Sequence, residues 1–151
     1  MTRIDFAFGA PDRLRAACRT ARKRFQAGQR LVVYCADGGR LAAFDRMLWA
    51  LEDVSFVPHV LANDALAADT PVLLTAGDPA AALALATTGD SRPWLLNLDD
   101  GCPPNFDDYE RLLEIVSDDP ADRQAARQRW RDYQNAGHAL HSHDLSRAGE
   151  A

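Results

Sequence analysis

The sequence contains few cysteines and almost no lysine. Three cysteines occur in 151 residues, and no two of them form a Cys-x-x-Cys pair. An odd number of cysteines without paired spacing is typical of reduced thiols, and it argues against a secreted scaffold held by disulfides. Lys23 is the only lysine among 17 basic residues, so arginine supplies nearly all of the positive charge.

Long apolar runs are also missing. No segment approaches the length of a membrane span, and the N-terminal stretch "MTRIDFAFGAP" lacks the apolar core of a signal peptide. We therefore expect a cytoplasmic protein without membrane contact. The 22 acidic residues outnumber the 17 basic ones, which gives a net charge of -5. This balance argues against general nucleic-acid binding, which needs a broadly basic surface.

The turns that contain glycine do not match nucleotide-binding motifs. The stretches "GAPDR" and "ADGGR" follow two predicted strands, and neither has the glycine spacing that closes backbone amides on phosphate. We interpret residues 37–39 as a turn that caps the next helix, and we predict no cofactor. An α/β enzyme that uses the loop from Asp37 to Gly39 is kept as an alternative.

Candidate catalytic and metal-binding residues stand apart from one another. Cys35 ends a predicted strand but has no neighbouring base, which favours a buried, inert thiol. His59 is predicted to be a hydrogen-bonded loop residue. His138, His141 and His143 lie in a polar segment where no rigid scaffold would fix metal geometry. We predict neither a catalytic residue nor a metal site.

Strand and helix patterns alternate along the chain. This order predicts one α/β domain over residues 1–140, with a mostly parallel sheet and helices on both faces, followed by a polar, flexible tail over 141–151. The predicted strands cover residues 4–8, 30–35, 55–61, 71–76 and 93–98. The predicted helices cover residues 11–28, 41–51, 107–116 and 121–135, and residues 79–86 are predicted to form an alanine-rich turn or a short helix.

Charge is segregated along the sequence. Residues 13–30 contain seven basic residues and no acid, whereas residues 99–119 contain eight acids and one arginine. Such faces either attract each other or are simply solvated.

The last predicted helix carries a stripe of arginines. Arg123, Arg127 and Arg131 are spaced i, i+4 and i+8, so they share one side of the helix, and Trp130 borders them. Guanidinium groups match carboxylates, and the aromatic ring adds an apolar wall. The stripe therefore indicates a site for an acidic peptide that ends in an aromatic residue and a free carboxylate.

Two other interpretations of this helix stay open. In one, Arg127 and Arg131 pair with Asp132 or with the acidic predicted helix before them on a solvated face, while Trp130 and Tyr133 belong to the core. In the other, arginines bind the backbone of a single-stranded nucleic acid and aromatic rings stack on its bases. A direct nucleic-acid binder of this kind would use the basic residues 13–30 together with residues 123–131.

Several segments resemble the chi subunit of bacterial DNA polymerase III over residues 2–140. The most specific of them are "FDRMLWAL" with "SFVPH", "PWLLNLDDGCPPNFDDYE" and "RQRWRDYQNAG", which occur in the same order as in that family. The resemblance implies a Rossmann-like fold without a nucleotide and a non-catalytic accessory role in the clamp-loader complex. It further implies binding to the acidic C-terminal tail of single-stranded DNA-binding protein, attachment to the psi subunit, and only indirect contact with DNA.

The resemblance also assigns residues. By match to the family's motifs, the tail-binding positions are Arg123, Arg127, Trp130 and Arg131, and the positions that face psi are Trp49 and Phe56. Arginine at 123 and 131 stands where well-known members have lysine, and Trp130 stands where tyrosine is common. Charge is thereby preserved at the two arginines, while any role of a tyrosine hydroxyl is lost.

Overall fold

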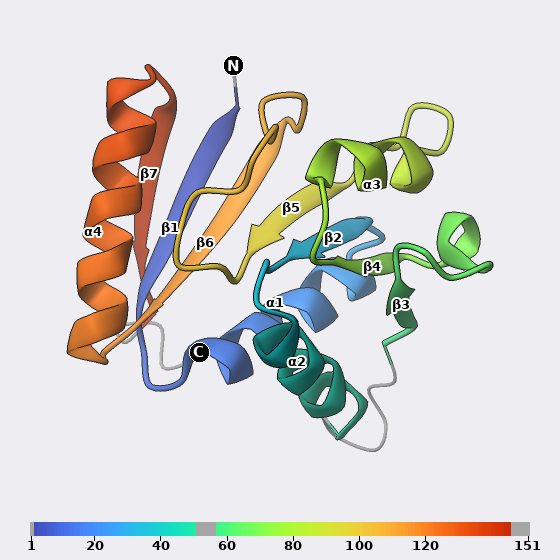
Figure 1. Ribbon diagram of the computed structural model, residues 1–151, viewed down its shortest axis with the longest axis horizontal. Coiled ribbons are helices and arrows are strands. Elements are labelled where there is room, and N and C mark those ends of the chain that lie inside the picture. Colours follow the sequence, from blue (N-terminus) through green and yellow to red (C-terminus); the bar gives the residue numbers. More distant parts are fainter. Residues whose placement is uncertain (1, 51–56, 146–151) are drawn as a thin grey trace.

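The computed structural model describes residues 2–50 and 57–145. Within these ranges, seven parallel strands form one sheet in the order β3-β4-β2-β5-β6-β1-β7 (Figure 1). The strands are β1 (Arg3–Ala10), β2 (Leu31–Tyr34), β3 (His59–Leu61), β4 (Val72–Thr75), β5 (Trp94–Asn97), β6 (Arg111–Ser117) and β7 (Ala139–Asp144). The helices are α1 (Arg13–Gln26), α2 (Gly38–Ala50), α3 (Pro79–Ala86) and α4 (Pro120–Asn135), with a short 3₁₀ turn η1 (Ala67–Asp69).

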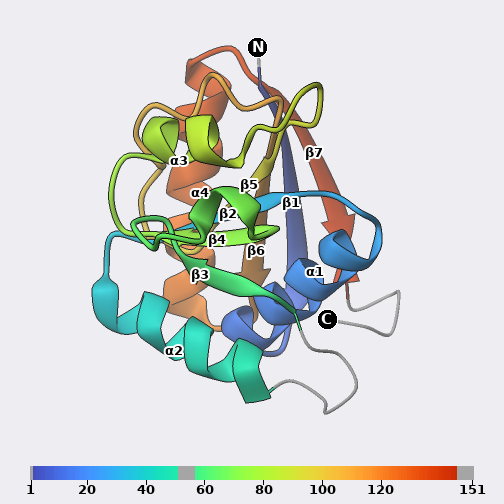
Figure 2. The same ribbon diagram turned by 90° about the vertical axis from the view of Figure 1, so that its right-hand side faces the viewer.

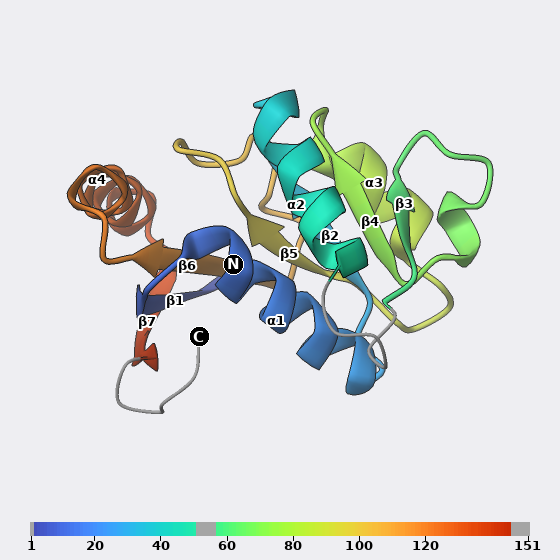
Figure 3. The same ribbon diagram turned by 90° about the horizontal axis from the view of Figure 1, so that it is seen from below.

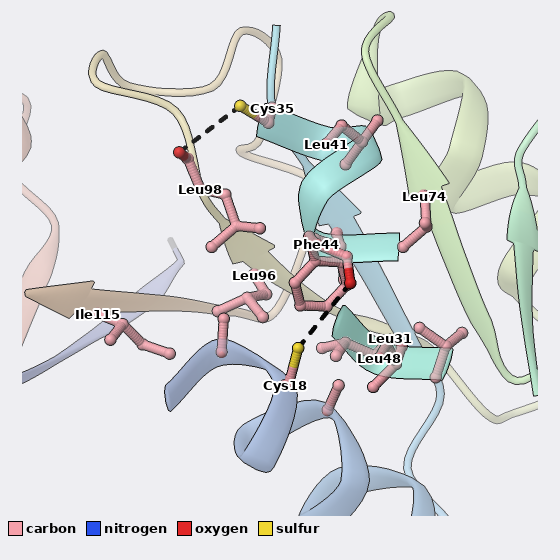
Figure 4. Close-up of a cluster of buried hydrophobic side chains, with 14 of the residues drawn as sticks. Cys18, Leu31, Cys35, Leu41, Phe44, Leu48, Leu74, Leu96, Leu98 and Ile115 are labelled. Atoms are coloured by element: carbon pink, nitrogen blue, oxygen red, sulfur yellow. Dashed lines mark hydrogen bonds between the residues drawn. The ribbon is translucent and has the colours of Figure 1, made fainter. Parts of the chain in front are cut away.

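Helices cover both faces of the sheet. Buried residues of α1 and α2 pack against one face, where the Cys18 thiol contacts the backbone carbonyl of Phe44 at 3.9 Å (Figure 4). On the other face, Ala82 of α3 and Tyr133 of α4 belong to a second apolar cluster. The prediction of a three-layer, Rossmann-like α/β domain is confirmed.

Aspartates fix the starts of three helices. The side chains of Asp12, Asp78 and Asp119 accept hydrogen bonds from backbone amides in the first turns of α1, α3 and α4, over 3.1, 2.9 and 3.0 Å. These bonds satisfy amides that have no partner inside the helix. Proline occupies the first turn of α3 and of α4, where its missing amide costs nothing.

The predicted helix at 107–116 is wrong, because residues 111–117 form strand β6 between β5 and β1. The spacing of Leu112, Leu113 and Val116 suits a helix, but it also suits a strand that is buried on both faces. Leu112 and Val116 pack on the α4 side, and Leu113 and Ile115 pack on the α1 side. A central strand of a parallel sheet shows no polar alternation that would identify it.

The predicted start of the tail is also wrong, because residues 139–144 form strand β7 at the edge of the sheet. His141 pairs with Asp5 of β1 in the ladder, and His143 pairs with Ala7. Backbone hydrogen bonds hold an edge strand even when its side chains are polar and exposed, so its sequence carries little apolar signal. Phe56 and the first part of the predicted strand at 55–61 lie outside the described residues.

Candidate functional site

Helix α4 packs against β6 and β7 close to one edge of the sheet (Figures 1 and 3). Its predicted extent of 121–135 is confirmed to within one residue. The helix ends two residues before Gly137, which has a φ of 87°. Glycine reaches this left-handed conformation without a steric penalty, and this explains why the helix stops here.

A pocket of about 330 Å³ opens between α4 and the sheet. All four side chains that were predicted to bind an acidic tail line this pocket. The lining residues from α4 are Arg123, Ala126, Arg127, Trp130 and Arg131, and those from the strands are Phe6, Phe8, Val116 and Ser142. Sequence reasoning did not find the strand residues, although Phe6 and Phe8 alternate along β1 and therefore share a face.

Aromatic rings form the apolar part of this pocket. The Phe6 ring meets the half-buried Trp130 ring edge-on, with 5.1 Å between the centroids. Phe8 is 42% exposed, an unusual degree for a phenylalanine on a sheet face beside a helix. The rings therefore leave apolar surface open to a ligand next to the arginines.

Two arginines of the pocket have side chains without a partner among the described residues. The side chains of Arg123 and Arg127 make no hydrogen bond or ion pair with any residue in the described ranges. Arg131 donates from Nη2 to Oε1 of Gln128 over 2.8 Å, and Gln128 in turn donates to Asp132 over 2.9 Å. Asp132 is thus bonded to a glutamine, and the alternative in which arginines of this stripe pair with it is not what the structure shows.

Arg129 differs from the other arginines of α4 because its side chain turns into the protein and is 1% exposed. Its Nε donates to Oε1 of Glu114 over 3.1 Å, and its Nη1 donates to the backbone carbonyl of Asp100 over 3.0 Å. Glu114 lies on β6 and is completely buried. A buried ion pair of this kind joins α4 to the centre of the sheet.

Glu114 has two hydrogen-bond donors besides Arg129, and Arg13 of α1 lies 3.9 Å from its Oε1. Tyr133 of α4 donates its hydroxyl to Oε2 over 2.6 Å, and Asn97 of β5 donates its amide over 2.9 Å. Burial, and secondly the negative charge of Glu114, raise the pKa of Tyr133 far above its usual range. One signal of this network is visible in the sequence, namely a glutamate between apolar residues in "RLLEIVS".

Trp49 belongs to α2 (Figure 2), and it does not line this pocket. It is 56% exposed and therefore does not pack in the core. Its ring contacts the ring of His59, with 4.6 Å between the centroids. His59 is buried, and its Nδ1 lies 2.6 Å from the Val57 carbonyl, which confirms the predicted hydrogen bond, but the residue begins strand β3 and is not part of a loop. Its Nε2 lies 2.8 Å from Oδ1 of Asp45.

A second cavity, of about 660 Å³, lies between α2, α3 and the ends of β3 and β4. Leu61 and Leu85 are exposed beside it, with Asp45 and Asp78 in its lining. Asp45 also contacts His59 and so links this cavity to the surroundings of Trp49.

The loop from Asp37 to Gly39 caps helix α2, as the sequence predicts. The Asp37 carboxylate accepts hydrogen bonds from the amides of Gly39 and Arg40 over 2.9 and 3.3 Å, so it caps α2. Cys35 is fully buried, with its sulfur 3.6 Å from the Leu98 carbonyl, and burial raises the pKa of its thiol (Figure 4). These contacts leave neither Asp37 nor Cys35 arranged as a nucleophile.

Two of the histidines near the C-terminus have different neighbours. His143 contacts Asp5 over 3.0 Å, whereas the His138 ring packs against Phe106 with 5.1 Å between the centroids. Over residues 2–50 and 57–145, no group of three or more His, Cys, Asp or Glu side chains is close enough to hold a metal ion. In the same ranges, no helix combines the length and the apolarity that crossing a membrane requires.

Fold and pocket together define a Rossmann-like α/β domain with an open binding site built from cations and aromatic rings. The family model of the DNA polymerase III chi subunit, HolC, matches residues 1–141. The chain belongs to this family, whose members are accessory subunits of the DNA polymerase III holoenzyme in DNA replication.

Individual relatives agree with this assignment. The chain is 35% identical to the DNA polymerase III subunit chi of Pseudomonas aeruginosa, over 97% of this chain and 99% of the relative. It is 26% identical to the subunit of the same name from Escherichia coli, over 83% and 80% of the two chains. For the subunit from Haemophilus influenzae the identity is 22%, over 85% of each chain.

Proposed function

We propose that this chain is a non-catalytic subunit that binds the acidic C-terminal tail of single-stranded DNA-binding protein and links it to DNA polymerase III. The observation that carries this proposal is the pocket on α4, where Arg123 and Arg127 have no partner among the described residues and lie beside exposed aromatic surface. The tail is expected to carry acidic groups, which match the arginine half of the pocket, and an apolar end, which matches the aromatic half.

The chemistry of the pocket assigns a role to each half. The free guanidinium groups of Arg123 and Arg127 take up aspartates and the terminal carboxylate, because each offers a planar pair of donors. The final aromatic residue packs against Phe6, Phe8 and Trp130, where stacked or edge-on rings add to the burial of apolar area. Arg131 lies at the end of the stripe and keeps its hydrogen bond to Gln128.

Single contacts of this kind are weak, because exposed ion pairs are screened by water and salt. A strand coated with single-stranded DNA-binding protein presents many tails at once. A second tail held nearby rebinds at a high effective concentration, so the coated strand retains the polymerase subunit better than one tail does.

We further propose that the surface around Trp49 contacts psi or another clamp-loader component. Trp49 is a large exposed aromatic residue, of the kind that is enriched at protein interfaces. It lies on the opposite face of the sheet from α4, so both partners have room to bind at the same time. The companion position, Phe56, is assigned from the resemblance alone.

Calorimetric titration with a peptide of the tail tests the proposal. We expect binding that weakens as salt rises and that disappears when the peptide lacks its final aromatic residue. Binding that ignores this truncation would contradict the role of the aromatic half of the pocket. No binding at low salt by the folded protein would refute the proposed function.

A further inference from the structure

The exposed side of α1 is strongly basic. The helix carries six basic residues and no acid, although the protein as a whole has a net charge of -5. Arg15, Arg19 and Lys23 are spaced i, i+4 and i+8, so they form one stripe with a rise of about 6 Å from each cation to the next. Local fields depend on where charges lie, and a stripe like this attracts polyanions despite the net charge.

The stripe faces away from the sheet. The buried side of α1 consists of small residues, among them Ala17, Cys18 and Ala21, whereas the stripe lies on the side that is exposed or half-buried. Arg13 does not belong to this stripe, because its side chain is 10% exposed and lies 3.9 Å from Glu114. Arg15 and Arg19 form no ion pair or hydrogen bond through their side chains within the described ranges. Their charges are therefore not used to hold the fold.

Two more cations extend this surface toward the start of β6. The guanidinium groups of Arg24 and Arg111 lie over the ring of Trp94, at 5.2 and 4.4 Å from its centroid. Cation–π contacts hold both groups in place without cancelling their charge. Asp5 neutralises part of this region, because it accepts a hydrogen bond from Arg111 over 2.7 Å.

Helix α1 lies on the other side of the sheet from α4, as Figure 3 shows. A ligand on α1 therefore does not compete with a peptide in the pocket that contains Arg127. We propose that the outer face of α1 binds the phosphate backbone of DNA directly and without sequence preference. This inference goes beyond the resemblance, which implies only indirect contact with DNA.

Phosphate fits this face better than an acidic peptide does. The stripe carries cations in a row but no apolar side chain, and the nearby Trp94 is already covered by guanidinium groups. A peptide would lack the apolar anchor that interfaces usually need. A nucleic-acid backbone needs only cations, and it is bound through the release of counterions.

Fluorescence anisotropy with a labelled single-stranded oligo(dT) and a labelled duplex of equal length tests this inference. With three to four phosphates contacted, we expect the logarithm of the affinity for oligo(dT) to fall with the logarithm of salt concentration with a slope of about -2 to -3. The two probes show whether the backbone is preferred as a single strand or as a duplex.

The decisive comparison uses two variants of equal charge change. Arg15→Glu with Arg19→Glu should weaken DNA binding about tenfold or more and leave binding of the tail peptide unchanged. Arg123→Glu with Arg127→Glu should weaken binding of the tail peptide and leave DNA binding unchanged. Arg46→Glu, an exposed change on α2, controls for charge reversal outside both faces.

Failure of this inference is distinct from failure of the proposed function. Absence of salt-dependent binding to both probes, or unchanged DNA binding by the Arg15 and Arg19 variant, would overturn it. Loss of DNA binding in the Arg123 and Arg127 variant alone would also overturn it, because the DNA site would then lie on α4.

Discussion

The two sides of helix α4 use the same residue type for opposite purposes. Arg129 points inward, where it is buried against Glu114 and holds the helix to the sheet. Arg123 and Arg127 point outward, where they line an open pocket and have no partner in the described part of the chain. The side of the helix and one buried carboxylate decide which arginine stabilises the fold and which one is available for binding.

This difference teaches that composition does not separate structural from functional charge. A buried arginine needs a charged partner and further hydrogen bonds, since an unpaired charge in the interior is very costly. An exposed arginine needs none, and it keeps its donors for a ligand. The following changes test the two sides separately.

The largest expected effect is on stability. Glu114→Ala leaves Arg129 buried without its carboxylate, and we expect the free energy of unfolding to fall by about 3–5 kcal/mol. Urea denaturation followed by circular dichroism measures this change. Glu110→Ala, at an exposed glutamate in the loop before β6, is the control and should change stability by less than about 0.5 kcal/mol. Equal effects of the two variants would contradict the structural role of the inward side.

The second largest expected effect is a loss of affinity for the tail peptide without a change in stability. Arg127→Ala should weaken tail-peptide binding about 30-fold, which corresponds to the loss of about 2 kcal/mol at an interface hot spot. Trp130→Ala should do the same because it removes apolar wall from the pocket. Titration calorimetry measures both, with the unfolding midpoint as a check on the fold. Normal peptide binding by both variants would contradict the claim that α4 carries the tail-binding site.

A conservative substitution at Arg127 separates the effect of its charge from that of its hydrogen-bond geometry. Arg127→Lys keeps the charge but loses the planar pair of donors, so we expect an intermediate affinity, about 3- to 10-fold below that of the unchanged protein. The same titration over a range of salt concentrations should give an unchanged salt dependence. If the lysine variant binds as poorly as the alanine variant, hydrogen-bond geometry rather than charge controls the site.

The smallest effect on fold and tail binding is expected at α2. Trp49→Ala removes a side chain that is already 56% exposed, so tail-peptide binding should stay unchanged and stability should change little. Co-purification with clamp-loader proteins should weaken. Unfolding of this variant, or loss of tail binding, would show that the two surfaces are not independent.

The parts of the fold that local patterns determine could be predicted from the sequence. Helix α4 follows from its capping residue, its first-turn proline and Gly137, and the stripe of Arg123, Arg127 and Arg131 follows from helical spacing alone. Strand β6 was missed because a strand buried on both faces has the same apolar run as a helix.

The rest of the site depends on contacts between distant segments. Glu114 of β6 and Arg129 of α4 are 15 positions apart in the sequence, and only the packing of α4 on β6 brings them within 3.1 Å. Phe8 and Ser142 join the pocket because β1 and β7 are neighbours, and the polar sequence of β7 gave no sign of an edge strand. Local periodicity carries no information about which strands pair.

Mapping the tail peptide onto the protein by nuclear magnetic resonance tests the central claim most directly. With the protein labelled with nitrogen-15, the account predicts that added peptide shifts the indole signal of Trp130 and the backbone amides of Arg127 and Ser142. Shifts concentrated at the cavity near Asp45 and Leu61, with α4 unaffected, would contradict the claim that the outward side of α4 is the binding site.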